Sequence, residues 1–380
     1  MIYFDNAATG MPKNPAAVKA AAEAMRTCGN PGRGGHPYSV AAAETVYNCR
    51  KKLAAMFGSR PDLVVFTSGA TEALNIAIKG ANRRGGLTVV SSLEHNSVLR
   101  PLNALRRRGE TSVRQFRVDI NEDSATLANF SAVSRGASNI VVTHASNVCG
   151  RVLPVAAMRA LAPDDAVFIL DASQTAGHIP LSVAELGVDV MCIPGHKGLC
   201  GPMGVGALII NPESDIYIES LIEGGTGTNS KSADMPDNYP EHLEAGTQNV
   251  CGIAGLSAAL DGFSYPVRER RVFGYLLQAM RLLPGITLHG APPSPAREAD
   301  YMPLLLFNRA GTDCETFAAR LAQKGFALRA GYHCSPAAHR TLGTFETGGV
   351  RLSLGESNTL AEAEKFISAL AELTNTSDDS

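Results

Sequence analysis

The sequence predicts an α/β protein with a large, mostly parallel β-sheet domain and a smaller α+β C-terminal domain. Between about residues 60 and 210, short apolar runs rich in Val and Ile alternate with segments of helical periodicity. Several runs are apolar throughout, as expected for strands buried on both faces of a parallel sheet. The predicted strands are 63–67, 87–91, 113–118, 139–143, 166–171, 188–193 and 205–210.

The pattern changes after the predicted sheet. Residues 211–250 lose periodicity and are rich in Gly, Thr, Ser, Asn and Pro, which indicates a long functional loop. The 380 residues suffice for two domains. We therefore expect a large domain of residues 15–260 and a small domain of residues 1–14 with 261–380. In the latter we predict strands 301–307 and 349–354, helix 314–324, a loop at 329–339 and a last helix from 359.

Bulk properties exclude several classes of function. The net charge of -2 gives no general attraction to nucleic acid or to acidic membranes. The N-terminus lacks a signal-peptide pattern, and no run approaches the roughly 18 apolar residues of a membrane span, so we expect a cytoplasmic protein. Eight cysteines without a C-x-x-C pair predict neither a disulfide framework nor a metal site.

Polar residues at strand ends are the candidates for function, because ligands of such sheets bind at the carboxyl ends of the strands. Lys197 follows strand 188–193 and lies among glycines. A desolvated lysine has a lowered pKa and can serve as an amine nucleophile. The simpler alternative is an exposed loop lysine.

Asp171 closes the apolar strand 166–170, which places a carboxylate at the mouth of the sheet. Pyridoxal 5'-phosphate (PLP) requires such a carboxylate against its pyridine nitrogen. Gln174, three residues later, could reach the ring hydroxyl of this cofactor. The alternative for Asp171 is an ordinary helix N-cap.

The segment 67–72 runs from a strand through small residues into a helix, which presents free N–H groups to a phosphate. It matches no nucleotide-binding motif, and the alternative is a capping box in which Ser68 or Thr71 caps the helix. His95 follows Glu94 after a strand, where an imidazole could stack on the cofactor ring and handle protons. A structural histidine is the alternative.

Cys334 differs from the other cysteines because it lies in a polar loop near Arg329, His333 and His339. Positive neighbours lower the pKa of a thiol and favour the nucleophilic thiolate. A metal site made of His333, Cys334 and His339 would lack a fourth ligand. Arg351 lies where a small-domain strand could hold a carboxylate bidentately.

In this order, the motifs resemble the class V aminotransferase family of fold-type I PLP enzymes, and within it the cysteine desulfurase and selenocysteine lyase group. The resemblance runs from residues 3–9, through 29–31, to 351–353 and 358–359. It implies a Schiff base on Lys197, Asp171 at the ring nitrogen, Gln174 at the ring hydroxyl and His95 stacked on the ring. The other implied ligands are Ala70, Thr71 and His196 for the phosphate, Asn147 for cofactor and substrate, and Arg329 and Arg351 for the substrate.

The resemblance also implies a partner and a reaction. Residues 224–227 resemble a loop that reaches the neighbour's PLP phosphate, which implies a homodimer with Thr226 acting in trans. Cys334 resembles the persulfide-forming cysteine of the short-loop R-x-G-x-H-C subgroup. L-cysteine would become L-alanine, with Lys197 taking the α-proton and His95 assisting, and the sulfur would pass from Cys334 to an acceptor protein.

Two residues depart from the family pattern. Pro194 stands where a Ser or Thr usually contacts the phosphate, and Tyr332 stands where the subgroup usually has a second His. Other functions remain open: a selenocysteine lyase, a transaminase of a small amino acid, a non-catalytic sulfur-assembly scaffold, or a dinucleotide-binding dehydrogenase. Lys197 and Cys334 together argue against the scaffold, and the missing glycine fingerprint argues against the dehydrogenase.

Overall fold

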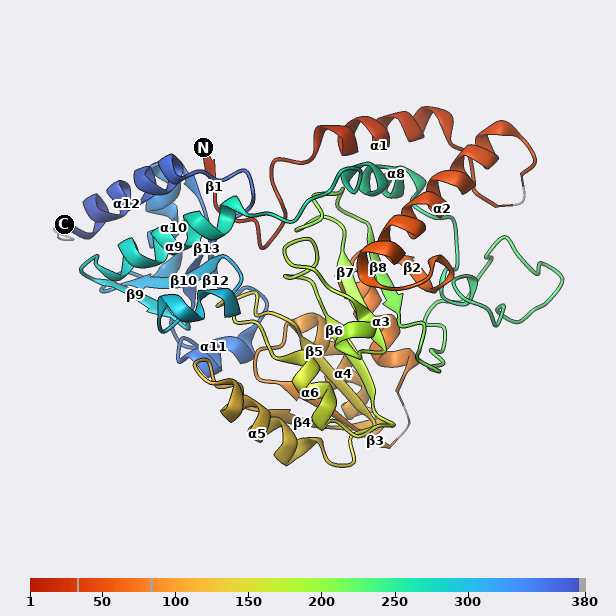
Figure 1. Cartoon of the computed structure of the whole chain (residues 1–380), viewed down its shortest axis with the longest axis horizontal. Coiled ribbons are helices and arrows are strands. Elements are labelled where there is room, and N and C mark those ends of the chain that lie inside the picture. Colours follow the sequence, from red (N-terminus) through yellow and green to blue (C-terminus); the bar gives the residue numbers. More distant parts are fainter. Residues whose placement is uncertain (33, 83–84, 376–380) are drawn as a thin grey trace.

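The computed structural model describes residues 1–32, 34–82 and 85–375, which form two lobes (Figure 1). The larger lobe contains a seven-stranded sheet of order β2-β8-β7-β6-β5-β3-β4. Its neighbouring strands are parallel except at β8, which runs antiparallel to β7 and to β2. The predicted α/β fold with a mostly parallel sheet is therefore confirmed. The strands are β2 (Val64–Thr67), β3 (Gly86–Ser91), β4 (Thr111–Phe116), β5 (Asn139–Thr143), β6 (Val167–Asp171), β7 (Val190–Pro194) and β8 (Gly206–Ile210).

Helices on both faces explain why the central strands are apolar throughout. In β6, Phe168 packs into one core cluster with Phe57, whereas its neighbour Ile169 packs into a second cluster with Leu74. Successive strand residues point to opposite faces, so both faces must be apolar when both are covered. The helices are α1 (Pro15–Thr27), α2 (Pro37–Phe57), α3 (Ala70–Gly80), α4 (Asn96–Arg107), α5 (Asp123–Ser134), α6 (Val155–Leu161), α7 (Val183–Leu186) and α8 (Val250–Ala259).

The smaller lobe is built on a four-stranded antiparallel sheet of order β12-β13-β10-β9. Its strands are β9 (Ile286–His289), β10 (Leu304–Arg309), β12 (Arg329–Gly331) and β13 (Gly349–Ser353). Its helices are α9 (Arg268–Arg281), α10 (Cys314–Gln323), α11 (Pro336–Leu342) and α12 (Leu360–Asn375). The N-terminal strand β1 (Ile2–Tyr3) pairs with β11 (Phe326–Ala327), and Phe4 packs against Phe366. We propose the same division as above, with residues 1–14 in the small domain.

Two segments differ from the expectation. The predicted loop 329–339 contains β12 and α11, and β9 was not predicted. β12 has the sequence Arg-Ala-Gly, which carries no strand propensity, and it exists because it pairs with β13. The long segment after β8 extends away from the body of the molecule, at the right of Figure 1. Among the residues that the structure describes, the regular element between β8 and α8 is the short 3-10 helix η2 (Glu241–Leu243).

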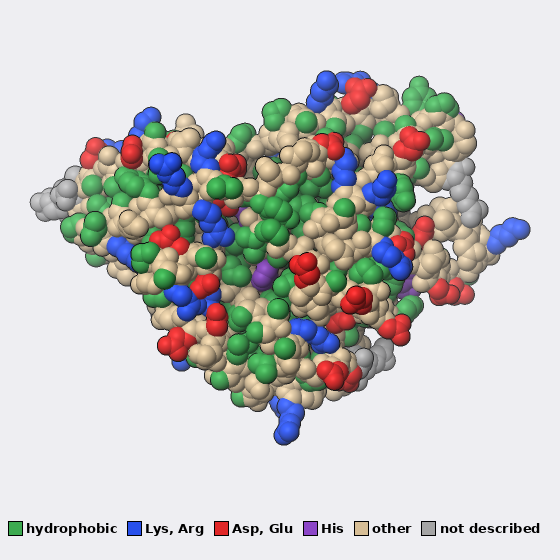
Figure 2. All heavy atoms as spheres, viewed as in Figure 1, with side chains coloured by type: hydrophobic (Ala, Val, Ile, Leu, Met, Phe, Trp, Pro, Cys, Tyr) green, Lys and Arg blue, Asp and Glu red, His purple; other side chains and the backbone are tan. Residues whose placement is uncertain are grey.

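The surface shows no dominant sign of charge on the face drawn in Figure 2, where acidic and basic side chains are interspersed. None of the described helices is long and apolar enough to cross a membrane.

Candidate active site

A cavity of about 230 Å³ lies where the carboxyl ends of the large-sheet strands meet the first turns of α3 and α4. All of the predicted cofactor residues except Thr226 line it: Ala70, Thr71, His95, Asn147, Asp171, Gln174, His196 and Lys197. They come from five separate stretches of the chain. Parallel strands bring their ends to one edge of the sheet, which is why residues so far apart meet here.

The turn that carries Lys197 is held by close backbone contacts. A Cβ at Gly10 would lie 2.6 Å from the Lys197 carbonyl oxygen, and one at Gly177 would lie 2.4 Å from the Gly198 carbonyl carbon. Burial lowers the pKa of the Lys197 amine to about 8, against the opposing effect of Asp171. Lys197 is therefore not the exposed loop lysine of the simpler alternative, and its amine is partly uncharged near neutral pH.

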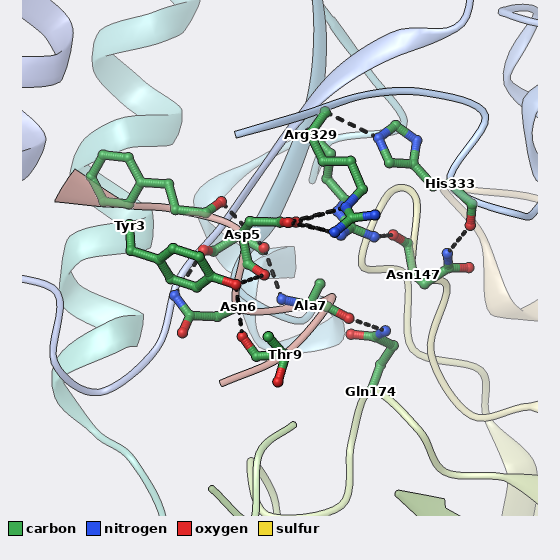
Figure 3. A network of polar contacts seen from close by, with 12 residues as sticks. Tyr3, Asp5, Asn6, Ala7, Thr9, Asn147, Gln174, Arg329 and His333 are labelled. Atoms are coloured by element: carbon green, nitrogen blue, oxygen red, sulfur yellow. Dashed lines mark hydrogen bonds and ion pairs between the residues drawn. The ribbon is translucent and has the colours of Figure 1, made fainter. Parts of the chain in front are cut away.

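Asp171 is the last residue of β6, and its side chain is buried beside the cavity. One carboxylate oxygen accepts a hydrogen bond of 3.0 Å from the Ser173 N–H. Gln174 donates its side-chain amide to the Ala7 carbonyl at 3.1 Å, which ties the cavity wall to the N-terminal segment (Figure 3).

The start of α3, whose first residues line the cavity, offers backbone donors. α3 begins after the N-cap Gly69, which has no side chain to satisfy the first N–H groups of the helix. The capping box with Ser68 or Thr71 as cap is therefore not formed. The hydroxyl groups of Thr71 and Ser97 lie 2.8 Å apart, and both residues line the cavity with Pro194. Ser97 was not singled out from the sequence.

His95 serves two purposes in this arrangement. It is the N-cap of α4, and its Nδ1 accepts a 3.0 Å hydrogen bond from the Ser97 N–H. Its ring also borders the cavity, where burial lowers the pKa of the imidazole. The structural alternative for His95 therefore holds alongside a position at the cavity.

Cys334 is exposed on a turn whose neighbours are buried. His333 and Cys334 both adopt left-handed backbone conformations, with φ of 51° and 57°. Such values are uncommon for residues other than glycine. The Cys334 carbonyl accepts a 2.8 Å hydrogen bond from the N–H of Asn96, the first residue of α4. The turn is thereby docked beside His95.

The positive neighbours expected around Cys334 are only partly present. Burial lowers the pKa of His333 to about 3 and that of His339 to about 4, so both rings are uncharged near neutral pH. They stack with centroids 5.6 Å apart, and His333 Nδ1 lies 3.3 Å from His339 Nε2. Arg329 remains a positively charged neighbour that interacts with Cys334, and its guanidinium is paired with Asp5. No group of three or more His, Cys, Asp or Glu among the described residues is placed to hold a metal ion.

Asp5 joins the two arginines that were predicted to bind substrate, and its contact with Arg329 is drawn in Figure 3. Arg329 donates to one Asp5 oxygen through Nε and a terminal nitrogen at 3.0 and 2.9 Å, and Arg351 donates to the other at 2.9 Å. Arg351 is buried and also donates to the Asn147 carbonyl at 2.8 Å. Asp5 was part of the N-terminal motif, but no chemical argument from the sequence singled it out.

Thr226 lies outside the cavity. It belongs to the long loop after β8, and its hydroxyl lies 3.0 Å from that of Thr228. With Asn30 and Pro31 it lines a different hollow, of about 1220 Å³. Within one chain, the predicted phosphate contact of Thr226 is therefore not made.

Comparison with known proteins agrees with this geometry. A family model described as aminotransferase class-V matches residues 2–366. The chain belongs to the class V aminotransferase family. A protein of Methanothermobacter thermautotrophicus described as "probable cysteine desulfurase" is 31% identical, over 98% of this chain and 94% of that protein. The apo structure of a cysteine desulfurase from Thermococcus onnurineus is 28% identical, with a TM-score of 0.88 over 98% of this chain and 94% of that one. CsdA of Escherichia coli gives 27% identity and a TM-score of 0.85, over 97% of this chain and 94% of that chain.

Family membership makes the chain a PLP enzyme, and the residues of the cavity fit this cofactor. A lysine of lowered pKa, a buried acid on the neighbouring strand and an uncapped helix N-terminus suit the aldehyde, the ring nitrogen and the phosphate of PLP, respectively.

Proposed function

We propose that this class V aminotransferase family member is a cysteine desulfurase of the short-loop subgroup, which forms a persulfide on Cys334. The observation that carries the proposal is the position of Cys334, an exposed residue whose carbonyl is held by the Asn96 N–H, next in sequence to His95 of the cavity that contains Lys197. The relatives described as cysteine desulfurases support it. A transaminase needs no thiol at this place.

We assign the following roles. When bound at Lys197, PLP supplies an electron sink for the substrate α-carbon. Asp171 keeps a proton on the ring nitrogen, and the Lys197 amine, with a pKa lowered to about 8, takes the α-proton. Arg351, with Arg329 and Asn147, holds the substrate carboxylate.

The sulfur step belongs to Cys334. Its thiolate attacks the substrate sulfur, so that an S–S bond forms and the Cβ–S bond breaks. The electron pair of the broken bond stays on the β-carbon, which takes up a proton, and Lys197 returns a proton to the α-carbon, so that L-alanine is released. The persulfide remains on an exposed residue, where an acceptor protein can reach it. We also keep the homodimer and the cytoplasmic location as proposals.

Two variants test the proposal. Lys197→Ala should yield colourless protein because the cofactor loses its covalent attachment, whereas Cys334→Ala should remain yellow. Cys334→Ala should lose sulfide release from L-cysteine, measured with a reducing thiol as acceptor. Sulfide release at the parental rate from Cys334→Ala would remove Cys334 from the mechanism. L-selenocysteine, assayed in parallel with alanine as the readout, separates a desulfurase from a selenocysteine lyase.

A further inference from the structure

The turn that carries Cys334 is held by one side chain of the cavity wall. The Asn147 amide nitrogen donates to the His333 carbonyl at 2.8 Å (Figure 3), and its amide oxygen accepts from the Ser335 hydroxyl at 2.7 Å. Asn147 is therefore hydrogen-bonded to the residues on both sides of Cys334. A third bond, from the Asn96 N–H, holds the carbonyl of Cys334 itself.

These contacts are buried. Ser335 has no exposed surface and Asn147 is 8% exposed, whereas Cys334 itself is exposed to solvent. Ser335 is fully buried, so water cannot easily take the place of its hydroxyl. Removing the hydroxyl would therefore leave the Asn147 amide oxygen without a hydrogen-bond partner. The amide would then be free to turn, and the bond to His333 would weaken with it.

The backbone of the turn needs such support. His333 and Cys334 are consecutive residues with positive φ, and neither has the freedom of glycine. Residues other than glycine keep this conformation only where the surroundings impose it. A relaxed turn would move the Cys334 sulfur relative to the cavity, because the direction of the Cα–Cβ bond follows the backbone.

We propose that Ser335 and Asn147 form a clamp that positions the Cys334 sulfur for attack on the substrate. Ser335 is a positioning residue, since its hydroxyl acts through Asn147. The inference rests on the proposed function. It adds that Asn147 couples two lobes of the protein, because it lines the cofactor cavity and holds the small-lobe turn at once.

Ser335→Ala tests the clamp. We expect sulfide release from L-cysteine to fall about tenfold or more, since misplacing a reacting group by about 1 Å can cost on the order of a hundredfold. Turnover of β-chloro-L-alanine, whose leaving group departs without a thiol, should fall by a clearly smaller factor in the same preparation, because only the contact of Asn147 with the substrate carboxylate is disturbed. The visible absorbance of bound PLP should be unchanged, because Lys197 still holds the cofactor.

Two controls separate positioning from other effects. Ser257→Ala removes another buried serine hydroxyl, which accepts a bond from Lys52, and it should leave both activities unchanged. The pH dependence of Cys334 alkylation by iodoacetamide, followed by peptide mass spectrometry, should have the same midpoint in Ser335→Ala as in the parent. A displaced midpoint would assign Ser335 to thiolate ionisation and overturn the clamp.

The remaining outcomes are also decisive. Undiminished sulfide release from Ser335→Ala would overturn the proposal, and so would an equal loss of both activities, which would mean a general structural role. Sulfide release that survives in Cys334→Ala would instead refute the proposed function, whatever Ser335 does.

Discussion

At the scale of single residues, Asp5 explains how two arginines can face one small site. Arg351 is nearly inaccessible to water and Arg329 is about half exposed, and both donate to the Asp5 carboxylate. The three side chains together carry one positive charge, which suits the single carboxylate of an amino acid substrate. Burying Arg351 without Asp5 would leave a charge uncompensated.

Asp5→Asn should therefore destabilise the protein. Removing one partner of a buried ion pair costs about 3–5 kcal/mol, and we expect a fall of this order in the free energy of unfolding from urea titration. Asp62→Asn is the matched control, because Asp62 pairs with Arg60 at the surface, with more than half of each side chain exposed. An exposed pair contributes about 1 kcal/mol at most. Equal losses in the two variants would contradict the role given to Asp5.

At the scale of elements, Glu94 joins the ends of two strands beneath the cavity. One carboxylate oxygen accepts from the Thr143 N–H at the end of β5 at 3.0 Å and from the Ser91 hydroxyl at the end of β3. Glu94 is fully buried, and burial raises its pKa from 4.5 to about 8. The side chain is therefore protonated near neutral pH and acts as a neutral link between β3 and β5.

This link should weaken in alkali. Because the folded state holds the proton of Glu94 more tightly than the unfolded chain, the stabilisation is complete below pH 4.5 and is lost as the pH rises through about 8. Glu94→Gln cannot ionise, so its melting temperature should rise relative to the parent between pH 6 and pH 9. Glu185→Gln, at an exposed position on α7, should follow the parent throughout. Parallel curves for Glu94→Gln and the parent would refute the pKa argument.

At the scale of the whole molecule, the position of the loop after β8 does not match its predicted role within a single chain. Thr226 lies away from the cavity whose phosphate end it was predicted to complete. The proposed homodimer accounts for this, since a neighbouring chain would supply the residue. The loop extends from the body of the molecule, as a segment that serves a partner would (Figure 1).

Mixed dimers test the exchange of Thr226. In a dimer of one Lys197→Ala chain and one Thr226→Ala chain, one site carries both defects and the other is intact if Thr226 acts in trans. We expect these mixed dimers, co-expressed with two different tags and purified through both, to show about half of the parental sulfide release at limiting PLP. Thr226→Ala homodimers should bind PLP more weakly. A fully active monomer, or no gain on mixing, would rule out the exchange.

The sequence by itself determined the large sheet and most of the cavity. A parallel strand with helices on both faces must be apolar on both faces. A short stretch of sequence therefore shows where the strand lies and which polar residue ends it, as Asp171 ends β6. Only the tertiary structure decided the rest. β12 exists through pairing with β13, burial removes the charges of His333 and His339, and the partners of Asp5, Asn147 and Ser335 lie more than 180 residues away along the chain. Pairing across such separations leaves no local periodicity, because it is set by how the two lobes pack and not by neighbouring residues.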